Sequence, residues 1–261
     1  MCLIVLAWKA HPRYPLILAT NRDEFHARRS APLRYWEGST DVLGGRDMEK
    51  GGSWLAANVD GRWAAVTNFR DGRLPSASSR SRGHLVSDYV TSNLPARTYA
   101  ANVETSLADY PGCNLLIAGR GELYYASNSY DSEPYTRTQI VAPGIHGLSN
   151  HLLNTPWPKV QRCKQHMQSL LDADADIIAQ SLFDLLADRT VANDTDLPST
   201  GVPVERERTL SAPFIVADGY GTRASTVLLI DDQGTARMHE RAFGAGGTEI
   251  GQQSFLFSIR N

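Results

Sequence analysis

The chain has 261 residues, and its 26 Lys and Arg against 28 Asp and Glu give a formal net charge of -2. This balance provides no general attraction to phosphate backbones or anionic membranes, so it argues against nucleic acid as a partner. Hydrophobic residues make up 42% of the chain, as in ordinary globular proteins. One mixed α/β domain can reach this length, so we expect a single domain over residues 1–261.

Cysteine usage and apolar runs indicate the compartment. The longest apolar run, Leu3 to Trp8, is far shorter than the roughly 20 residues of a membrane helix, and no basic signal-peptide segment follows Met1. The three cysteines, Cys2, Cys113 and Cys163, lack CxxC spacing, which argues against a disulfide framework and a structural zinc site. We expect a cytoplasmic protein without integral membrane association; the oligomeric state stays open.

The first two apolar runs predict an antiparallel hairpin. Leu3–Trp8 and Leu16–Ala19 flank a loop containing Pro12 and Pro15 and centred on residue 12. Paired positions should therefore sum to about 24, which places Cys2 opposite the segment 21–24.

A second hairpin is predicted from Trp54–Val59 and Trp63–Phe69. Asp60-Gly61 between two strand-like runs suits a two-residue type I′ turn. Asn68 then lies near the end of the second strand.

Periodicity predicts the remaining elements. These are helices around Leu85–Val90, at Thr98–Ala108, after an N-cap at Thr155-Pro156 and at Asp176–Ala187, and strands at Cys113–Gly119, Leu123–Ser127, Thr226–Ile230, Arg237–Phe243 and Gln252–Ile259. Residues 71–83 form a polar stretch, 140–150 are irregular to extended, and 188–213 form a long surface loop. The order predicts an α+β fold, a four-layer αββα sandwich of two mainly antiparallel sheets.

Cys2 is the sharpest candidate for chemistry. Removal of Met1 would leave a cysteine whose own α-amine can act as the base for its thiol, since their reference pKa values are about 7.7–8.0 and 8.5. The alternative is an ordinary buried cysteine that only packs in its strand.

Polar residues at the expected strand ends could complete a site with Cys2. Arg22 could lower the pKa of the thiol, Asp23 could orient the amine, and Asn68 could donate to an oxyanion. Asn150 shows the same pattern as Asn68, and Arg223 could bind a carboxylate or phosphate. The alternative is that polar side chains collect at strand ends and turns. The histidine spacings match no zinc motif, so no metal site is expected.

Several segments together resemble the NRDE-motif family, also called the transport and Golgi organisation family. They are Met1–Ile4, Asn21–Phe25, Gly51–Leu55, Ala65–Arg70, Gly147–Asn150 and Gly221–Thr226. The resemblance implies an N-terminal nucleophile (Ntn) hydrolase-like αββα fold. It also links the chain to a family whose members are associated with Golgi organisation, lipid metabolism and haem trafficking or mobilisation.

A more distant similarity to the cysteine Ntn amidases, which include penicillin V acylase and bile salt hydrolase, implies roles for the candidate residues. Cys2 resembles their nucleophile, Asp23 the carboxylate that holds its amine, and Asn68 the oxyanion asparagine, while Asn150 and Arg223 resemble later polar site residues. Those amidases carry Arg-Asn-x-Asp where this chain has Asn21-Arg22-Asp23, which leaves the role of Arg22 open.

Two function classes follow. The first is hydrolysis of a nonpeptide amide by Cys2 as N-terminal nucleophile, which requires no cofactor. The second is a non-catalytic carrier that holds haem or a lipid-like ligand in the same cavity. The fold alone does not choose between them.

Overall fold

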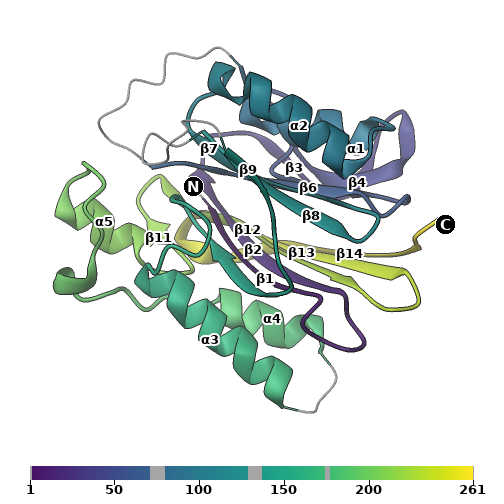
Figure 1. Cartoon of the computed structure of the whole chain (residues 1–261). Coiled ribbons are helices and arrows are strands. Elements are labelled where there is room, and N and C mark those ends of the chain that lie inside the picture. Colours follow the sequence, from purple (N-terminus) through teal and green to yellow (C-terminus); the bar gives the residue numbers. More distant parts are fainter. Residues whose placement is uncertain (1, 71–79, 129–136, 174–176, 261) are drawn as a thin grey trace.

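Two antiparallel sheets stack face to face, and helices cover their outer faces (Figure 1). The computed structural model describes residues 2–70, 80–128, 137–173 and 177–260. This arrangement is the αββα sandwich that the order of elements predicts.

The first sheet contains seven strands, all paired antiparallel. In spatial order they are β10 (Gly144–Leu148), β1 (Cys2–Trp8), β2 (Leu16–Phe25), β12 (Tyr220–Ile230), β13 (Thr235–Phe243) and β14 (Glu249–Ser258), with the short β11 (Val216–Ala217) paired to β12. The hairpin of β1 and β2 therefore lies inside the sheet and not at its edge.

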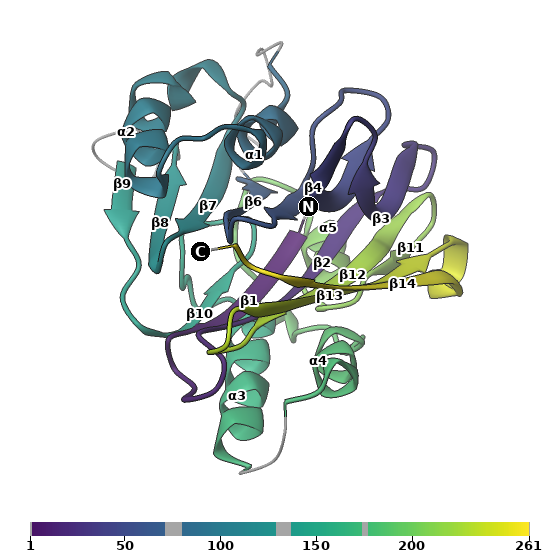
Figure 2. The same cartoon turned by 90° about the vertical axis from the view of Figure 1, so that its right-hand side faces the viewer.

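The second sheet also contains seven strands, which follow one another in the chain as a meander (Figure 2). They are β3 (Ser30–Trp36), β4 (Ser39–Asp47), β5 (Leu55–Asn58), β6 (Trp63–Asn68), β7 (Cys113–Gly119), β8 (Glu122–Ser127) and β9 (Arg137–Ile140). β3 and β4 lie where the sequence pattern predicts no element, because Pro32, Gly38 and Gly44-Gly45 interrupt the run. β3 is an edge strand, where a proline removes no ladder hydrogen bond.

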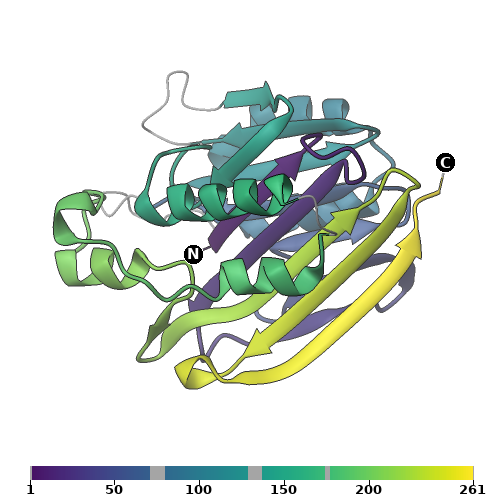
Figure 3. The same ribbon diagram turned by 90° about the horizontal axis from the view of Figure 1, so that it is seen from below.

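Two of the described helices lie against each sheet. α1 (Arg82–Thr91) and α2 (Ala96–Ser106) cover the second sheet, while α3 (Pro158–Asp172) and α4 (Ala179–Leu186) cover the first (Figure 3). α3 begins at Pro158, two residues after the predicted Pro156. The predicted loop 188–213 contains α5 (Val204–Leu210), so that prediction is wrong over this segment. No helix in the described ranges has the length and apolar character needed to cross a bilayer.

Some predicted features lie outside the described residues. They are the state of Met1, most of the polar stretch 71–83 and the predicted helix start at Asp176.

The register of the β1–β2 hairpin confirms the loop arithmetic. Cys2 pairs with Arg22 and Trp8 pairs with Leu16, so both pairs sum to 24. Side chains directly opposite each other in an antiparallel ladder point to the same face. Cys2 and Arg22 therefore share one face of the first sheet.

The turn between β5 and β6 differs from the predicted type I′ turn. Asn58 N–H donates to the carbonyl of Arg62, and the positive φ falls on Gly61 and not on Asp60. This geometry is a three-residue loop with a glycine bulge, in which only the last loop residue needs φ above zero. Consecutive positive φ values occur instead at Arg120 and Gly121, between β7 and β8.

Alternation along β1 divides its side chains between two hydrophobic cores. Ile4, Leu6 and Trp8 lie in the core between the sheets, whereas Leu3 and Val5 pack in the core beneath α3 and α4. Both faces of the strand are buried, which explains its unbroken apolar sequence. Each such buried side chain stabilises the fold by about 1.5–3 kcal/mol. Cys2 has the parity of Ile4 and faces the space between the sheets.

A close backbone contact fixes the start of α1. Gly52 has φ +74°, and a Cβ atom there would lie 2.3 Å from the carbonyl carbon of Gly83. The N–H of Ser53 donates to the carbonyl of Gly83 at 3.1 Å. Only glycine allows this approach, so Gly52 and Gly83 hold the first turn of α1, including Arg82, against the second sheet.

We predict that Gly52→Ala lowers the free energy of unfolding by about 3 kcal/mol or more, because strained φ and steric overlap add. Gly38→Ala is the control, since Gly38 has φ +78° and a Cβ atom there would meet no other described atom within 4 Å. In this variant the free energy of unfolding should fall by only about 1 kcal/mol, which is the cost of a positive φ for alanine. Urea unfolding measures both, and equal losses would contradict the proposed close contact.

Candidate active site

Cys2 begins β1 at the end of the sandwich opposite the C-terminal segment (Figure 1). Its side chain is buried, and its carbonyl accepts a hydrogen bond of 3.1 Å from the hydroxyl of Ser149. Burial raises the pKa of the thiol above its ordinary value, although the charge of Arg22 acts in the opposite direction. The resting thiol is therefore protonated at neutral pH and needs a base before it can attack.

Arg22 lies directly opposite Cys2 and is 6% exposed. Its guanidinium carbon lies 4.3 Å from the ring centre of Trp54, and its Nη2 is 3.9 Å from the Glu24 carboxylate. Nη1 is buried and has no hydrogen-bond partner among the residues that the structure describes. The register therefore places Arg22 on the same face as the Cys2 thiol, while its role stays a prediction.

Asp23 follows in β2 and therefore points to the opposite face, toward the helices. It is 1% exposed, and its Oδ1 accepts a hydrogen bond of 2.7 Å from the hydroxyl of Thr222. Burial raises the pKa of this carboxyl, while the positive charge of Lys159 favours its ionised form. Asp23 is thus one residue beyond the Cys2–Arg22 pair in the ladder.

A chain of hydrogen bonds connects Cys2 to Asn68 at the end of β6. The hydroxyl of Ser149 lies within hydrogen-bond distance of two acceptors, the Cys2 carbonyl at 3.1 Å and Oδ1 of Asn150 at 3.3 Å, which share its single proton. Nδ2 of Asn150 donates to the carbonyl of Asn68 at 2.9 Å. The structure therefore brings together both predicted asparagines and the nucleophile candidate, from three different strands or strand ends.

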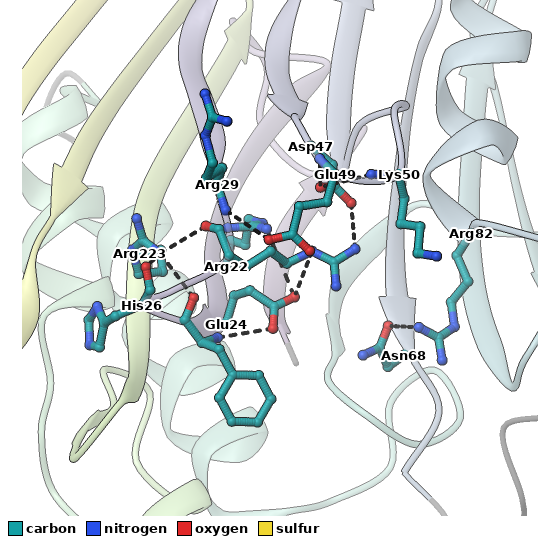
Figure 4. A network of polar contacts seen from close by, with 12 residues as sticks. Arg22, Glu24, His26, Arg29, Asp47, Glu49, Lys50, Asn68, Arg82 and Arg223 are labelled. Atoms are coloured by element: carbon teal, nitrogen blue, oxygen red, sulfur yellow. Dashed lines mark hydrogen bonds and ion pairs between the residues drawn. The ribbon is translucent and has the colours of Figure 1, made fainter.

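Arg82 is a functional candidate that the sequence patterns did not indicate. Its Nη1 donates to Oδ1 of Asn68 at 2.7 Å (Figure 4). Its Nε donates to the carbonyl of Pro111 at 3.4 Å. Because Oδ1 of Asn68 is the acceptor, the assigned orientation leaves Nδ2 of that amide available as a donor. The signal that could have identified Arg82 was its neighbour Gly83, a glycine where a helix begins.

Lys159 is a second missed residue. It is 1% exposed, its Nζ donates to the carbonyl of Leu210 at 2.9 Å, and burial lowers its pKa to about 8. Asp23 provides the largest opposing charge. Lys159 lies one turn before Cys163 on the apolar side of α3, and a lysine on a buried helix stripe was the signal that could have identified it.

Arg223 is held by backbone carbonyls. Its Nη1 donates to the carbonyls of Phe25 and His26 at 3.0 Å each (Figure 4). Its Nε donates to the carbonyl of Phe243. These contacts clamp the segment after β2 to the bulge in β12. Its proposed role in substrate binding stays a prediction.

The other two cysteines are unsuited to nucleophilic chemistry. Cys113 and Cys163 are buried, and burial raises the pKa of each thiol to about 12. Within the described ranges, no three His, Cys, Asp or Glu side chains are close enough to hold a metal ion. The arrangement around Cys2 instead supplies a thiol, a carboxylate, an amide donor and guanidinium groups, which suits acyl transfer.

Two solved structures share the fold. The chain aligns with a Caenorhabditis elegans N-acylethanolamine-hydrolyzing acid amidase ortholog (TM-score 0.51, 10% identity, 87% of this chain and 92% of that one). It also aligns with a mutant of conjugated bile acid hydrolase from Clostridium perfringens (TM-score 0.56, 10% identity, 99% and 92%). At this identity the likeness shows the fold alone, and it confirms the predicted Ntn-hydrolase-like architecture.

Sequence comparison is more specific. The bovine (Bos taurus) Transport and Golgi organization protein 2 homolog is 32% identical, and the Homo sapiens homolog is 31% identical, each over 93% of both chains. Transport and Golgi organization protein 2 of Drosophila melanogaster is 27% identical over 92% of this chain and 90% of that protein. The profile of the family described as Transport and Golgi organisation 2 matches residues 1–245. The chain therefore belongs to the Transport and Golgi organisation 2 family.

Proposed function

We propose that the chain is a cysteine Ntn amidohydrolase that cleaves a nonpeptide amide, with Cys2 as its first residue after removal of Met1. The observation that carries the proposal is the register of the β1–β2 hairpin, which puts Arg22 opposite Cys2 and Asp23 one residue further along. Two fold neighbours that are named as an amidase and a hydrolase support the same class. A reducing cytoplasm would keep the thiol free.

The chemistry uses groups of this chain alone. The α-amine of Cys2 takes the thiol proton, and the thiolate attacks the carbonyl carbon of the amide. The available Nδ2 of Asn68 donates to the oxyanion. The α-ammonium returns the proton to the leaving amine as the C–N bond breaks. Water, deprotonated by the same amine, then hydrolyses the thioester and restores the thiol.

Asp23 and Lys159 have supporting roles in this proposal. An ionised Asp23 would hold the α-ammonium, but burial alone favours its neutral form. The positive charge of Lys159 acts against that effect and favours the ionised carboxylate. Lys159 is thus a positioning residue that acts through Asp23.

We predict that Cys2→Ala abolishes turnover and that Cys2→Ser lowers kcat by at least ~10³-fold, because a hydroxyl is a far weaker nucleophile near neutral pH. A series of chromogenic acyl p-nitroanilides of different chain length is the substrate panel, and intact-mass spectrometry detects the acyl-enzyme. Cys163→Ala is the control, since that thiol is buried under α3 and should affect packing only. Retention of Met1 in the native protein would contradict the amine-base mechanism.

The depressed pKa of Lys159 predicts how stability depends on pH. Between about 8 and the ordinary value of 10.5, the unfolded chain binds a proton that the folded chain has lost. The free energy of unfolding therefore rises with pH in this window, by up to about 3 kcal/mol, and is flat below it. Subtracting the profile of Lys159→Met isolates this contribution in urea titrations.

Lys164→Met is the matched control on the same helix, because Lys164 is only partly buried and bonds Asn154 at the surface. Its difference profile should be much flatter. If the difference between the wild-type and Lys159→Met profiles is also flat, Lys159 is not a buried cation in the folded protein.

A carrier of haem or a lipid-like ligand is the second candidate, and one observation favours it. A pocket of about 610 Å³ lies at the end of the sandwich near the C-terminal segment. Apolar side chains that include Trp8, Leu16, Trp63 and Ile230 line it, beside charged side chains that include Asp60, Arg62, Glu122 and Arg260. The names of the relatives, which refer to transport, support the same reading. This cavity is remote from Cys2, contrary to the expectation that one cavity serves both functions. Its described lining contains no imidazole or thiol.

We therefore predict that Cys2→Ala leaves the affinity for a metal-free porphyrin or a fatty acid unchanged. Tryptophan fluorescence reports the titration, because Trp8 and Trp63 line the cavity. Haem is titrated in parallel. A haem absorption spectrum that differs between Cys2→Ala and the wild type, with unchanged affinity for the metal-free ligands, would identify Cys2 as an iron ligand. Absence of binding by the wild-type protein would eliminate the carrier.

A further inference from the structure

Arg22 is a buried cation whose charge is poorly compensated. Its shortest approach to a described carboxylate is 3.9 Å, to Oε2 of Glu24, and the same oxygen lies 3.7 Å from Nε of Arg28. The other oxygen of Glu24 accepts from the N–H of Phe25. A buried guanidinium nitrogen without a hydrogen-bond partner costs stability, so Nη1 of Arg22 is a donor in need of an acceptor.

Arg82 is a second cation without an acidic partner among the described residues. Its contacts are the neutral side chain of Asn68 and the carbonyl of Pro111. Burial disfavours its charged form, which lowers its pKa from the ordinary value. Its position is fixed nonetheless, because the close contact of Gly52 with Gly83 holds the first turn of α1.

The two arginines come from different layers, and the charge of Cys2 interacts with both. Arg22 is opposite Cys2 on the first sheet, and Arg82 binds Asn68, which the hydrogen-bond chain connects to Cys2. The thiol does not supply the missing negative charge at rest, because burial raises the pKa of Cys2. Over the described part of the chain, the only carboxylate in ion-pair range of either guanidinium is therefore that of Glu24, which Arg22 shares with Arg28.

We propose that Arg22 and Arg82 form an anion subsite beside Cys2, which binds a carboxylate or phosphate that the substrate carries near its scissile amide. The inference rests on the proposed function in taking Cys2 as the attacking group. Guanidinium groups favour such anions because their donors match the oxygens in geometry and charge. The subsite would complete the hydrogen bonding of Arg22 and select anionic amides over neutral ones. Arg223 is less suited to this role, because carbonyls occupy its Nη1 and Nε.

Alkylation of Cys2 tests the subsite without any knowledge of the substrate. Iodoacetate carries a carboxylate, and iodoacetamide is its neutral counterpart of similar shape. Both react with the same thiolate, so the ratio of their rates does not depend on the pKa of Cys2. Mass spectrometry of the Cys2 peptide gives both rates, and glutathione supplies the reference ratio.

We expect the ratio of iodoacetate to iodoacetamide rates in the wild-type protein to exceed that of glutathione by about tenfold. Arg22→Gln and Arg82→Gln should each lower it by about three- to tenfold. Arg29→Gln is the control, because Arg29 is exposed on the same rim and loses the same charge (Figure 4). An equal drop in this control would reduce the effect to general surface charge and overturn the subsite.

A measurement on the wild type alone guards against variants that fail to fold. Inorganic phosphate and acetate should slow the reaction of Cys2 with iodoacetamide saturably at constant ionic strength, whereas chloride should not, and the stronger protector identifies the preferred anion. A glutathione-like ratio without protection by either anion would overturn the proposal. Alkylation requires only the thiol, so this test can fail while amide hydrolysis is present, and can succeed while hydrolysis is absent.

Discussion

Burial of the β1–β2 hairpin on both faces is the constraint on which the rest of the site depends. One face packs between the sheets and the other beneath α3 and α4, so a slip by one residue would move every side chain to the wrong core. The register is therefore fixed strongly. Because of it, Cys2 and Arg22 share the inter-sheet face while Asp23 points to the helices. The Cys2 thiol with Arg22 and the Asp23 carboxylate therefore lie on opposite faces of one hairpin.

The charges around this hairpin come from different layers and are only partly balanced. Asp23 and Lys159 are both about 1% exposed and influence each other beneath the first sheet. Nearby, Arg70 and Glu207 form a buried ion pair that joins the end of β6 to α5. Buried charges are costly unless paired, so their concentration at one end of the sandwich is better explained by a site than by stability. Arg22 and Arg82 are the members whose balance is incomplete.

Local patterns predicted the elements that carry strong periodicity, and failed where tertiary packing overrides propensity. The hairpin arithmetic placed Cys2 opposite the segment 21–24, which contains its partner Arg22, because loop length and strand pairing are local properties. β3 and β4 were missed because glycine and proline break their pattern, yet neighbouring strands and the Trp54 side chain fill the space beside Gly45. The type I′ prediction at Asp60-Gly61 failed because the same dipeptide also fits a three-residue loop.

The sequence by itself determined the hairpin, the strand ends with polar residues and the αββα order, since these follow from periodicity and turn chemistry. Only the tertiary structure decided that Arg82 and Lys159 join the residues around this hairpin. Arg82 is 80 residues away in the chain and reaches Asn68 because Gly52 and Gly83 let two backbones touch. Lys159 reaches the neighbourhood of Asp23 because α3 packs on β1. Contacts between segments so far apart in the sequence depend on how the layers pack, and no local sequence pattern encodes them.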